Sequence, residues 1–230
     1  MEKHYGLIFD VDGVIADTEP PTAAATKKMF ADLFGVDGVK TADFEAGLGR
    51  GAEAYILAAA KIYGLQLTQE QLIKAVAARE ANFIELMQEF PLQPFPGVLE
   101  LMAKALDQPD FKLAIATSSS RDMSEVVLKA AGVPYDRMAY VSGSDVTRKK
   151  PDPQIFLLAA ERMGIPPANC AVIEDTPGGV EAAKAAGTMC IAVTNTASPK
   201  VLAQADLICD SLQQITVETV RNLIRTKASS

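Results

Sequence analysis

The sequence predicts an α/β fold: a doubly wound, Rossmann-like parallel sheet with a small α-helical cap domain inserted after the first strand. Two observations support this fold class. Short apolar runs alternate with helical patterns over most of the chain, as they do when helices cover both faces of a parallel sheet. One long stretch near the N-terminus, in contrast, contains helical patterns and no convincing strand.

The first group of elements consists of short apolar runs, which we interpret as buried parallel strands. Such strands are covered on both faces, so they lack the alternation of a strand with one exposed face. Four runs are clear, and a fifth is weaker. In chain order they are Tyr5 to Phe9, Leu113 to Ala116, the weaker run Met138 to Val141, Ala171 to Ile173, and Met189 to Val193.

Helices are expected between the later strands, because residues that commonly begin and end helices flank them. In two of them a proline, Pro153 or Pro177, occupies the first helical position, where its missing N–H costs nothing. Each is followed by a glycine. The first helix is expected from about Asp122 to the residue before Gly132. The second follows the N-cap Asp152 and ends before Gly164, and the third follows the N-cap Thr176 and ends before Gly187.

The inserted stretch, residues 17–90, is expected to form the cap domain, and residues 1–16 and 91–230 the core domain. Its two connections to the core, near Ile15 to Pro21 and Phe90 to Pro96, could serve as hinges. The clearest cap helix carries an apolar stripe at helical spacing. The stripe consists of Leu72, Val76, Phe83, Met87 and Phe90.

The composition excludes several classes of partner. With a net charge of −7 and a sequence pI of about 4.9, the surface repels nucleic acid and anionic lipid, so we expect neither as a partner. No apolar stretch approaches the ~20 residues of a membrane helix, and the first residues do not resemble a signal peptide. We therefore expect a cytoplasmic protein. The sequence does not indicate an oligomeric state, and a monomer is the default expectation. The three cysteines lack paired spacing, which argues against disulfides or a zinc site.

Two aspartates, Asp10 and Asp12, come directly after the first predicted strand. In a doubly wound sheet, ligands bind outside the carboxyl ends of the strands. Two carboxylates at that place repel each other unless a cation intervenes, and Mg²⁺ is usually held by one or two carboxylates plus a substrate phosphate. Taken alone, a solvated Asp-x-Asp-Gly turn explains the motif equally well.

Polar residues also follow later strands. Thr117 and Ser118 precede a helix whose N-terminus suits a phosphate, although an ordinary serine N-cap is the commoner use of such residues. Lys150 precedes another helix and could neutralise phosphate oxygens, or belong to a solvated basic turn. Glu174 and Asp175 could complete a metal site with the first two aspartates, or merely favour the following helix dipole.

In chain order, the four motifs contain an acid pair, hydroxyls, a lysine and a second acid pair. This order resembles the haloacid dehalogenase superfamily, whose motifs read Asp-x-Asp, Thr/Ser, Lys and a paired acid. The similarity covers nearly the whole chain, and the insertion resembles the family's small helical cap. The nearest subgroup holds β-phosphoglucomutase and many sugar-phosphate phosphatases. The runs that carry the resemblance are Phe-Asp-Val-Asp-Gly-Val, Lys-Pro-Asp-Pro-Gln-Ile-Phe and Glu-Asp-Thr-Pro-Gly-Gly-Val-Glu-Ala-Ala-Lys-Ala-Ala-Gly.

The resemblance implies phosphoryl transfer through an aspartyl-phosphate. It assigns Asp10 as the nucleophile, and Asp12 as the general acid toward the leaving alcohol and then the base for the incoming water. By the same resemblance, Mg²⁺ is bound by Asp10, Asp175 and the backbone carbonyl of Asp12, with Glu174 as a possible further ligand. The dehalogenases of the superfamily attack carbon and do not need the second aspartate.

By the same resemblance, Thr117, Ser118 and neighbouring backbone amides bind the phosphate oxygens. Lys150 neutralises the charge of these oxygens. Two cap arginines are further candidates for substrate binding. Arg50, between two glycines, resembles a cap-loop substrate contact of the family; a solvated loop arginine is the alternative. Arg79 lies on the apolar stripe, where a charge is unusual unless it is paired, so it either binds substrate or extends its head into water.

Departures from the mutase pattern decide between two activities. The mutase branch carries a histidine shortly after the first motif, where this chain has Thr22, and the only histidine here is His4. Arg79 stands about where the mutases have a cap lysine. We therefore expect a Mg²⁺-dependent phosphatase acting on a small phosphorylated metabolite, such as a sugar phosphate. A phosphosugar mutase is the alternative, and a catalytically inactive phosphate-binding regulatory module is the alternative of another class.

Overall fold

A computed structural model describes residues 4–89 and 92–227. Within them, six strands form one parallel sheet in the order β3-β2-β1-β4-β5-β6, so the chain runs outward from β1 in both directions. This order confirms the predicted doubly wound sheet. The strands are β1 (Tyr5–Phe9), β2 (Phe111–Ala116), β3 (Ala139–Val141), β4 (Cys170–Glu174), β5 (Met189–Val193) and β6 (Leu207–Cys209).

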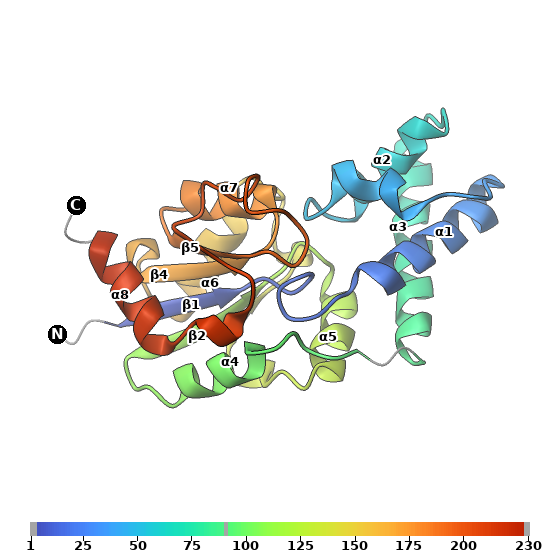
Figure 1. Cartoon of the computed structure of the whole chain (residues 1–230). Coiled ribbons are helices and arrows are strands. Elements are labelled where there is room, and N and C mark those ends of the chain that lie inside the picture. Colours follow the sequence, from blue (N-terminus) through green and yellow to red (C-terminus); the bar gives the residue numbers. More distant parts are fainter. Residues whose placement is uncertain (1–3, 90–91, 228–230) are drawn as a thin grey trace.

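Helices cover both faces of this sheet (Figure 1). Alternate residues of β1 contribute to opposite cores: Leu7 and Phe9 to one, Ile8 to the other. On the first face pack α4 (Val98–Leu106), α5 (Arg121–Ala130) and α8 (Val217–Lys227); on the second, α6 (Gln154–Met163) and α7 (Pro177–Ala185). The short helices η2 (Tyr135–Arg137), η3 (Gly143–Asp145), η4 (Pro167–Asn169) and η5 (Leu212–Gln214) lie in the connections. Burial on both faces explains the nearly continuous apolar strands.

The cap consists of α1 (Glu19–Phe34), η1 (Thr41–Gly47), α2 (Ala52–Ile62) and α3 (Gln69–Met87). Figure 1 shows it beyond the end of the sheet where β1 leads into α1. The cap has a core of its own, in which the rings of Phe44 and Tyr55 stack with centroids 4.5 Å apart. None of the described helices is long and apolar enough to cross a membrane.

The two connections between cap and core lie side by side. Ala16 forms an antiparallel bridge with Pro94, and the N–H of Phe95 donates to the carbonyl of Ile15 at 2.7 Å. The expected domain boundary at residues 90 and 91, and the start of the second expected hinge, lie outside the described residues. Because both connections pass through one place, they could together act as a hinge for the cap.

The apolar stripe of α3 serves two cores. Leu72 packs in the core of the cap, whereas Phe83 and Met87 pack in the core that covers the sheet. Val76 is half-buried against the cap core, and Phe90 lies outside the described residues. The C-terminal half of α3 therefore joins the cap to the core domain.

Several details differ from the sequence predictions, among them the start of one helix and one strand. The N-cap of α6 is Pro153 and not Asp152, so the helix begins one residue later than expected; the Asp152 carboxylate still accepts the N–H of Gln154 at 2.9 Å. The strand β6 was not predicted. It has three residues, of which Leu207 and Ile208 are only partly buried, so its apolar run is too short to indicate a strand.

Candidate active site

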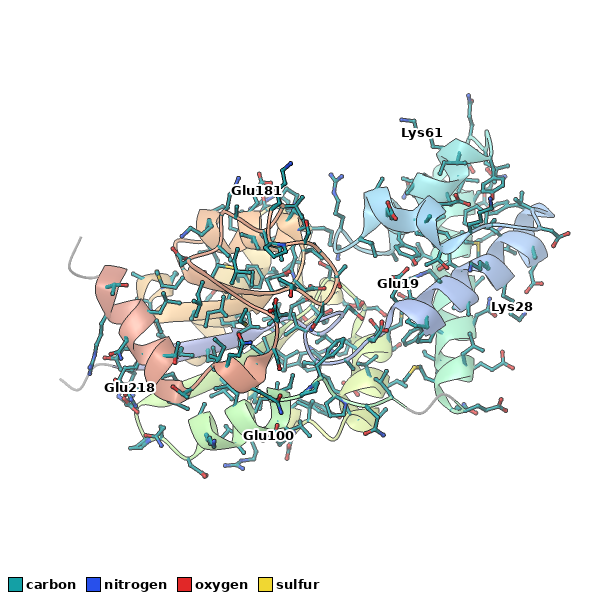
Figure 2. The ribbon with its side chains drawn as sticks, viewed as in Figure 1. Glu19, Lys28, Lys61, Glu100, Glu181 and Glu218 are labelled. Atoms are coloured by element: carbon teal, nitrogen blue, oxygen red, sulfur yellow. The ribbon has the colours of Figure 1, made fainter. Side chains whose placement is uncertain are left out.

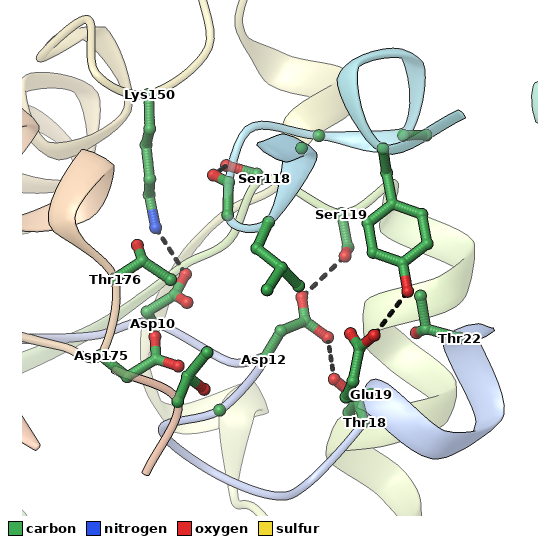
Figure 3. Close-up of a pocket in the computed structure, with 18 of the residues that line it drawn as sticks. Asp10, Asp12, Thr18, Glu19, Thr22, Ser118, Ser119, Lys150, Asp175 and Thr176 are labelled. Carbon is green, nitrogen blue, oxygen red and sulfur yellow. Dashed lines mark hydrogen bonds and ion pairs between the residues drawn. The ribbon is translucent and has the colours of Figure 1, made fainter. Parts of the chain in front are cut away.

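Asp10 directly follows β1, and its backbone N–H donates to the carbonyl of Ile173 in β4 at 3.1 Å. This fixes the residue between the two central strands. Lys150 reaches it from the loop before α6, and its ammonium Nζ lies 2.7 Å from Oδ1 of Asp10 (Figure 3). The same Nζ lies 2.5 Å from Oε1 of Glu174. All three side chains are buried. One cation therefore joins the end of β1 to the end of β4.

The second carboxylate oxygen of Glu174 is also fully engaged. It accepts the N–H groups of Asp175 and Thr176, at 2.9 and 3.0 Å, and the hydroxyl of Thr176 at 3.0 Å. A Cβ at Gly179 would lie 1.8 Å from the carboxyl carbon of Glu174, so the first turn of α7 can pack on it only with glycine there. Glu174 is therefore held rigidly against Lys150.

Three carboxylates could hold a metal ion. Asp10, Glu174 and Asp175 each offer an oxygen atom, all within 4.8 Å of one another, and all three residues are buried. Burial raises the pKa of Asp10 to about 8, with Glu174 and Asp12 adding to the rise and Lys150 opposing it. Burial also raises the pKa of Asp175, again with a contribution from Glu174. When ionised, these three carboxylates outnumber the one ammonium group of Lys150, which contacts two of them.

One atom of the cluster shows how a cation could be bound. Among the described residues, Oδ1 of Asp175 is a buried side-chain oxygen without a hydrogen-bond partner. A buried carboxylate oxygen without a partner is costly, and a bound cation removes that cost. The donors are all oxygen atoms, which suit Mg²⁺ or Ca²⁺ better than softer metals. The residues present therefore fit a hard divalent cation.

Gly13 allows the first and fourth motifs to approach each other. Its φ is +80°, and a Cβ there would lie 1.9 Å from Oδ2 of Asp175. The side-chain amide of Asn195 donates to the Gly13 carbonyl at 2.8 Å and holds this turn from the other side. Only glycine permits this backbone conformation and this contact together.

The carboxylate of Asp12 lies apart from the acidic cluster and accepts hydrogen bonds from three hydroxyls. Thr18 donates to Oδ1 at 2.6 Å, and Ser119 and Thr117 donate to Oδ2 at 2.7 and 3.2 Å. Figure 3 shows Asp12 turned toward Thr18 and Ser119. The two aspartates of the first motif therefore occupy different environments.

The hydroxyl residues after β2 have distinct positions. Thr117 is fully buried and contacts Asp12, while Ser118 lines the pocket and donates to the carbonyl of Gly49 in the cap at 3.1 Å. Ser119 was not predicted, because nothing in a run of three serines distinguishes the one that contacts Asp12. The contact from Ser118 to Gly49 shows that the cap lies directly over the site.

A pocket lies between the core and the cap. Arg79 lines this pocket and is only 6% exposed. Arg50 is exposed and is not among the lining residues. Thr117 and Glu174 are buried and lie behind the wall of the pocket. The core contributes Asp10, Asp12, Ser118, Ser119, Lys150, Asp175, Thr176 and Thr196, and the cap contributes Glu19, Thr22, Tyr55 and Arg79, among others. The pocket therefore joins the acidic cluster to a polar wall of the cap.

Sequence reasoning missed two residues of that wall, Glu19 and Tyr55. The hydroxyl of Tyr55 donates to Oε1 of Glu19 at 2.6 Å (Figure 3). The only signal in the sequence is an acidic residue close behind the first motif, which is also typical of the first turn of a helix. The pairing with Tyr55 follows from the way α1 and α2 both pack into the core of the cap, and it has no sequence pattern.

Comparison with known proteins gives a consistent result. The family described as haloacid dehalogenase-like hydrolase matches residues 6–187. The fructose-1-phosphate phosphatase YqaB of Escherichia coli is 34% identical over 188 residues, which cover 81% of this chain and 94% of that protein. The chloroplastic protein SUPPRESSOR OF QUENCHING 1 of Arabidopsis thaliana is 33% identical over 95% of this chain, and the chain spans 21% of its length.

Solved structures show the same fold. CbbY of Rhodobacter sphaeroides, in complex with xylulose 1,5-bisphosphate, superposes with a TM-score of 0.83 at 28% identity, covering 94% of this chain and 99% of that one. A β-phosphoglucomutase of Clostridium difficile superposes with a TM-score of 0.85 at 23% identity, covering 99% of this chain and 100% of the other. The second likeness is one of fold.

Proposed function

This chain belongs to the haloacid dehalogenase-like hydrolase family, and we propose that it is a Mg²⁺-dependent phosphatase that hydrolyses a small sugar phosphate through a phosphorylated Asp10. The arrangement of Asp10 and Asp12 carries this proposal. Asp10 lies beside Lys150 in the acidic cluster, while Asp12 lies among hydroxyls on the same core wall of the pocket. A nucleophile and a proton donor are thereby available to one substrate from separate positions.

In the first step, a carboxylate oxygen of Asp10 attacks the phosphorus atom, the bond from phosphorus to the sugar oxygen breaks, and Asp12 gives its proton to that oxygen. In the second step, Asp12 takes a proton from water, whose oxygen attacks phosphorus and releases phosphate from Asp10. Lys150 stays charged beside Asp10 and offsets the repulsion between carboxylate and phosphate. Ser118 lines the same wall and can donate to a phosphate oxygen once its hydroxyl turns away from the Gly49 carbonyl.

Asp10, Asp175 and the backbone carbonyl of Asp12 would hold Mg²⁺, with Glu174 as a possible further ligand. Oδ1 of Asp175, which has no hydrogen-bond partner within the described part of the chain, supports this set. Both oxygens of Glu174 already accept hydrogen bonds, so its main part in the site is to hold Lys150. A bound Mg²⁺ supplies positive charge next to the carboxylates and the phosphate oxygens.

The substrate class is inferred from the relatives and from the pocket. One relative is named as a fructose-1-phosphate phosphatase, and one superposed structure holds xylulose 1,5-bisphosphate. The cap wall of the pocket is polar, with Glu19, Thr22 and Arg79 facing the core across it. A polar wall opposite the reacting group suits a substrate with hydroxyl groups.

The test is a phosphate-release assay over sugar phosphates, phosphoglycolate, nucleotides and pyrophosphate, with Mg²⁺ or with EDTA. We expect Mg²⁺-dependent release from sugar phosphates and none from the Asp10→Asn variant. Conversion of β-glucose 1-phosphate into glucose 6-phosphate without net phosphate release would instead establish the mutase alternative. If neither phosphate release nor this conversion is detected, the inactive phosphate-binding module is the remaining alternative.

A further inference from the structure

Arg79 is a buried cation without an ion-pair partner among the described residues. Its side chain is 6% exposed; Nε donates to the hydroxyl of Thr26 at 3.1 Å, and Nη1 lies 3.6 Å from the sulfur atom of Met123. The guanidinium carbon lies 5.3 Å from the centroid of the Tyr55 ring. A guanidinium has five N–H donors, so these two contacts leave donors for whatever occupies the pocket that Arg79 lines.

Glu19 is the acceptor beside it on the same wall. Its Oε1 accepts the Tyr55 hydroxyl at 2.6 Å, and Tyr55 is itself held by stacking on Phe44. Of the charged residues labelled in Figure 2, Lys28 and Lys61 lie on the outer sides of the cap, whereas Glu19 lies where the cap meets the core. Tyr55 thus fixes one oxygen of Glu19, and the other is available to a ligand.

We propose that Glu19 and Arg79, positioned by Tyr55, form a distal subsite that binds the hydroxyl groups at the far end of the substrate. The subsite selects monophosphates of sugars and polyols over esters with an apolar tail and over bisphosphates. The inference deepens the proposed function and rests on it, since it assumes that the reacting phosphate lies at Asp10. The three residues come from three different cap helices, α1, α2 and α3, and none belongs to the four catalytic motifs.

Hydroxyl groups match this pair better than a second phosphate does. A hydroxyl can donate to Glu19 and accept from Arg79, so one neutral chain satisfies both residues. A phosphate dianion can accept from Arg79 but has no proton for Glu19 and meets its negative charge. Thr22, buried on α1 and lining the same pocket, offers one more hydroxyl.

An apolar tail fails for a different reason. It would cover the second carboxylate oxygen of Glu19 and the remaining N–H groups of Arg79 and leave these atoms without hydrogen-bond partners. An unsatisfied buried polar group costs more than a good contact gains. Sites that are built to bind a substrate hydroxyl therefore reject analogues that lack it. This predicts discrimination between two esters of equal length.

The experiment compares kcat/KM for sorbitol 6-phosphate and for hexyl phosphate, which has the same six-carbon chain without hydroxyls. We expect kcat/KM of the wild type to be at least about 100-fold higher for sorbitol 6-phosphate than for hexyl phosphate. We also expect a higher kcat/KM for fructose 1-phosphate than for fructose 1,6-bisphosphate. Glu19→Gln and Arg79→Met should each lower kcat/KM for sorbitol 6-phosphate about 10- to 100-fold and change that for hexyl phosphate by less than about threefold. Glu53→Gln, an exposed change on α2, is the matched control and should change neither.

Tyr55→Phe tests the positioning role. It removes the hydrogen bond to Glu19 and keeps the ring that stacks on Phe44. We expect a several-fold rise in KM for sorbitol 6-phosphate, with kcat and the rate on hexyl phosphate little changed. Equal losses on both substrates would mean that the residue only supports the cap.

The outcomes separate the subsite from the reaction. Equal losses on both esters in Glu19→Gln and Arg79→Met would overturn the subsite, and a preference for the bisphosphate would overturn the selection of hydroxyls. If no ester is hydrolysed, the proposed function fails. Calorimetric titration of the Asp10→Asn protein with sorbitol 6-phosphate and hexyl phosphate still tests the subsite without turnover, and equal affinities would contradict it.

Discussion

Nζ of Lys150 lies 2.7 Å from Oδ1 of Asp10, and both side chains are buried at the carboxyl end of the sheet. The two residues are 140 positions apart in the sequence, so the fold alone brings them together. The same ammonium also contacts Glu174. The stability and the chemistry of the site both depend on this cation, because it faces several buried carboxylates.

Replacing Lys150 by methionine should destabilise the protein strongly. Removing one partner of a buried ion pair leaves an uncompensated charge, which typically costs about 3–5 kcal/mol. Urea denaturation in EDTA measures the loss, and Lys129→Met, at an exposed pair with Glu125, should change the free energy of unfolding by less than about 1 kcal/mol. A Lys150→Met protein as stable as the control would contradict the ion-pair account.

The metal-free protein should show an unusual pH dependence. The pKa of Asp10 is raised by burial from 3.8 to about 8, so this carboxyl binds more protons in the folded state than in the unfolded state between these pH values. Its stabilising contribution is complete below pH 4 and is lost as the pH rises through 8. In EDTA, the free energy of unfolding of the wild type should fall relative to that of Asp10→Asn from pH 5 to pH 8. A constant difference between the two proteins would exclude the shift.

Gly13→Ala should damage the metal site as well as the backbone. A Cβ at Gly13 would collide with the Asp175 carboxylate, whereas at Gly35, which also has a positive φ, it would meet no atom within 4 Å. Gly35→Ala should therefore cost only the strain of the left-handed conformation, about 1–2 kcal/mol. Gly13→Ala should cost more and also weaken Mg²⁺ binding, as measured by the Mg²⁺ dependence of Tm. Equal losses in the two variants would contradict the contact.

Asp175→Asn should have opposite effects on stability and on metal binding. The substitution removes a buried charge whose Oδ1 has no partner among the described residues, so the protein in EDTA should become more stable. Loss of a residue that contacts a metal ligand, but not the metal, typically lowers metal affinity about 10- to 100-fold. Calorimetric titration should show a larger loss of Mg²⁺ affinity for Asp175→Asn, because Asp175 would itself be a ligand. Asp136→Asn, at an exposed position, is the control. Unchanged Mg²⁺ affinity would exclude Asp175 as a ligand.

Much of the core domain could be predicted from the sequence, because full burial leaves a clear pattern. The bounds of β1 and β5 agree with the apolar runs, and β2 and β4 differ from theirs by one or two residues. The half-buried β6 left no such pattern. Parallel strands end at the same edge, which is why four motifs far apart in the sequence could be expected in one place.

The cap side of the pocket could not be predicted in the same way. The placement of Arg79 on a buried stripe follows from helical periodicity, and the structure has it buried and facing the pocket. The pairing of Glu19 with Tyr55 depends on how α1 and α2 both pack into the cap core, and the contact of Ser119 with Asp12 depends on a loop conformation. Neither contact has a period or a spacing that a sequence displays.

The central claim is that Asp10 carries the phosphoryl group, and a rapid-quench experiment tests it most directly. The protein is mixed with Mg²⁺ and fructose 1-phosphate labelled in the phosphate, quenched in acid during turnover, and digested for mass analysis. We predict a phosphorylated peptide containing Asp10, absent from the Asp10→Asn variant, whose turnover is also abolished. Label on another residue, or unchanged turnover by Asp10→Asn, would contradict the account.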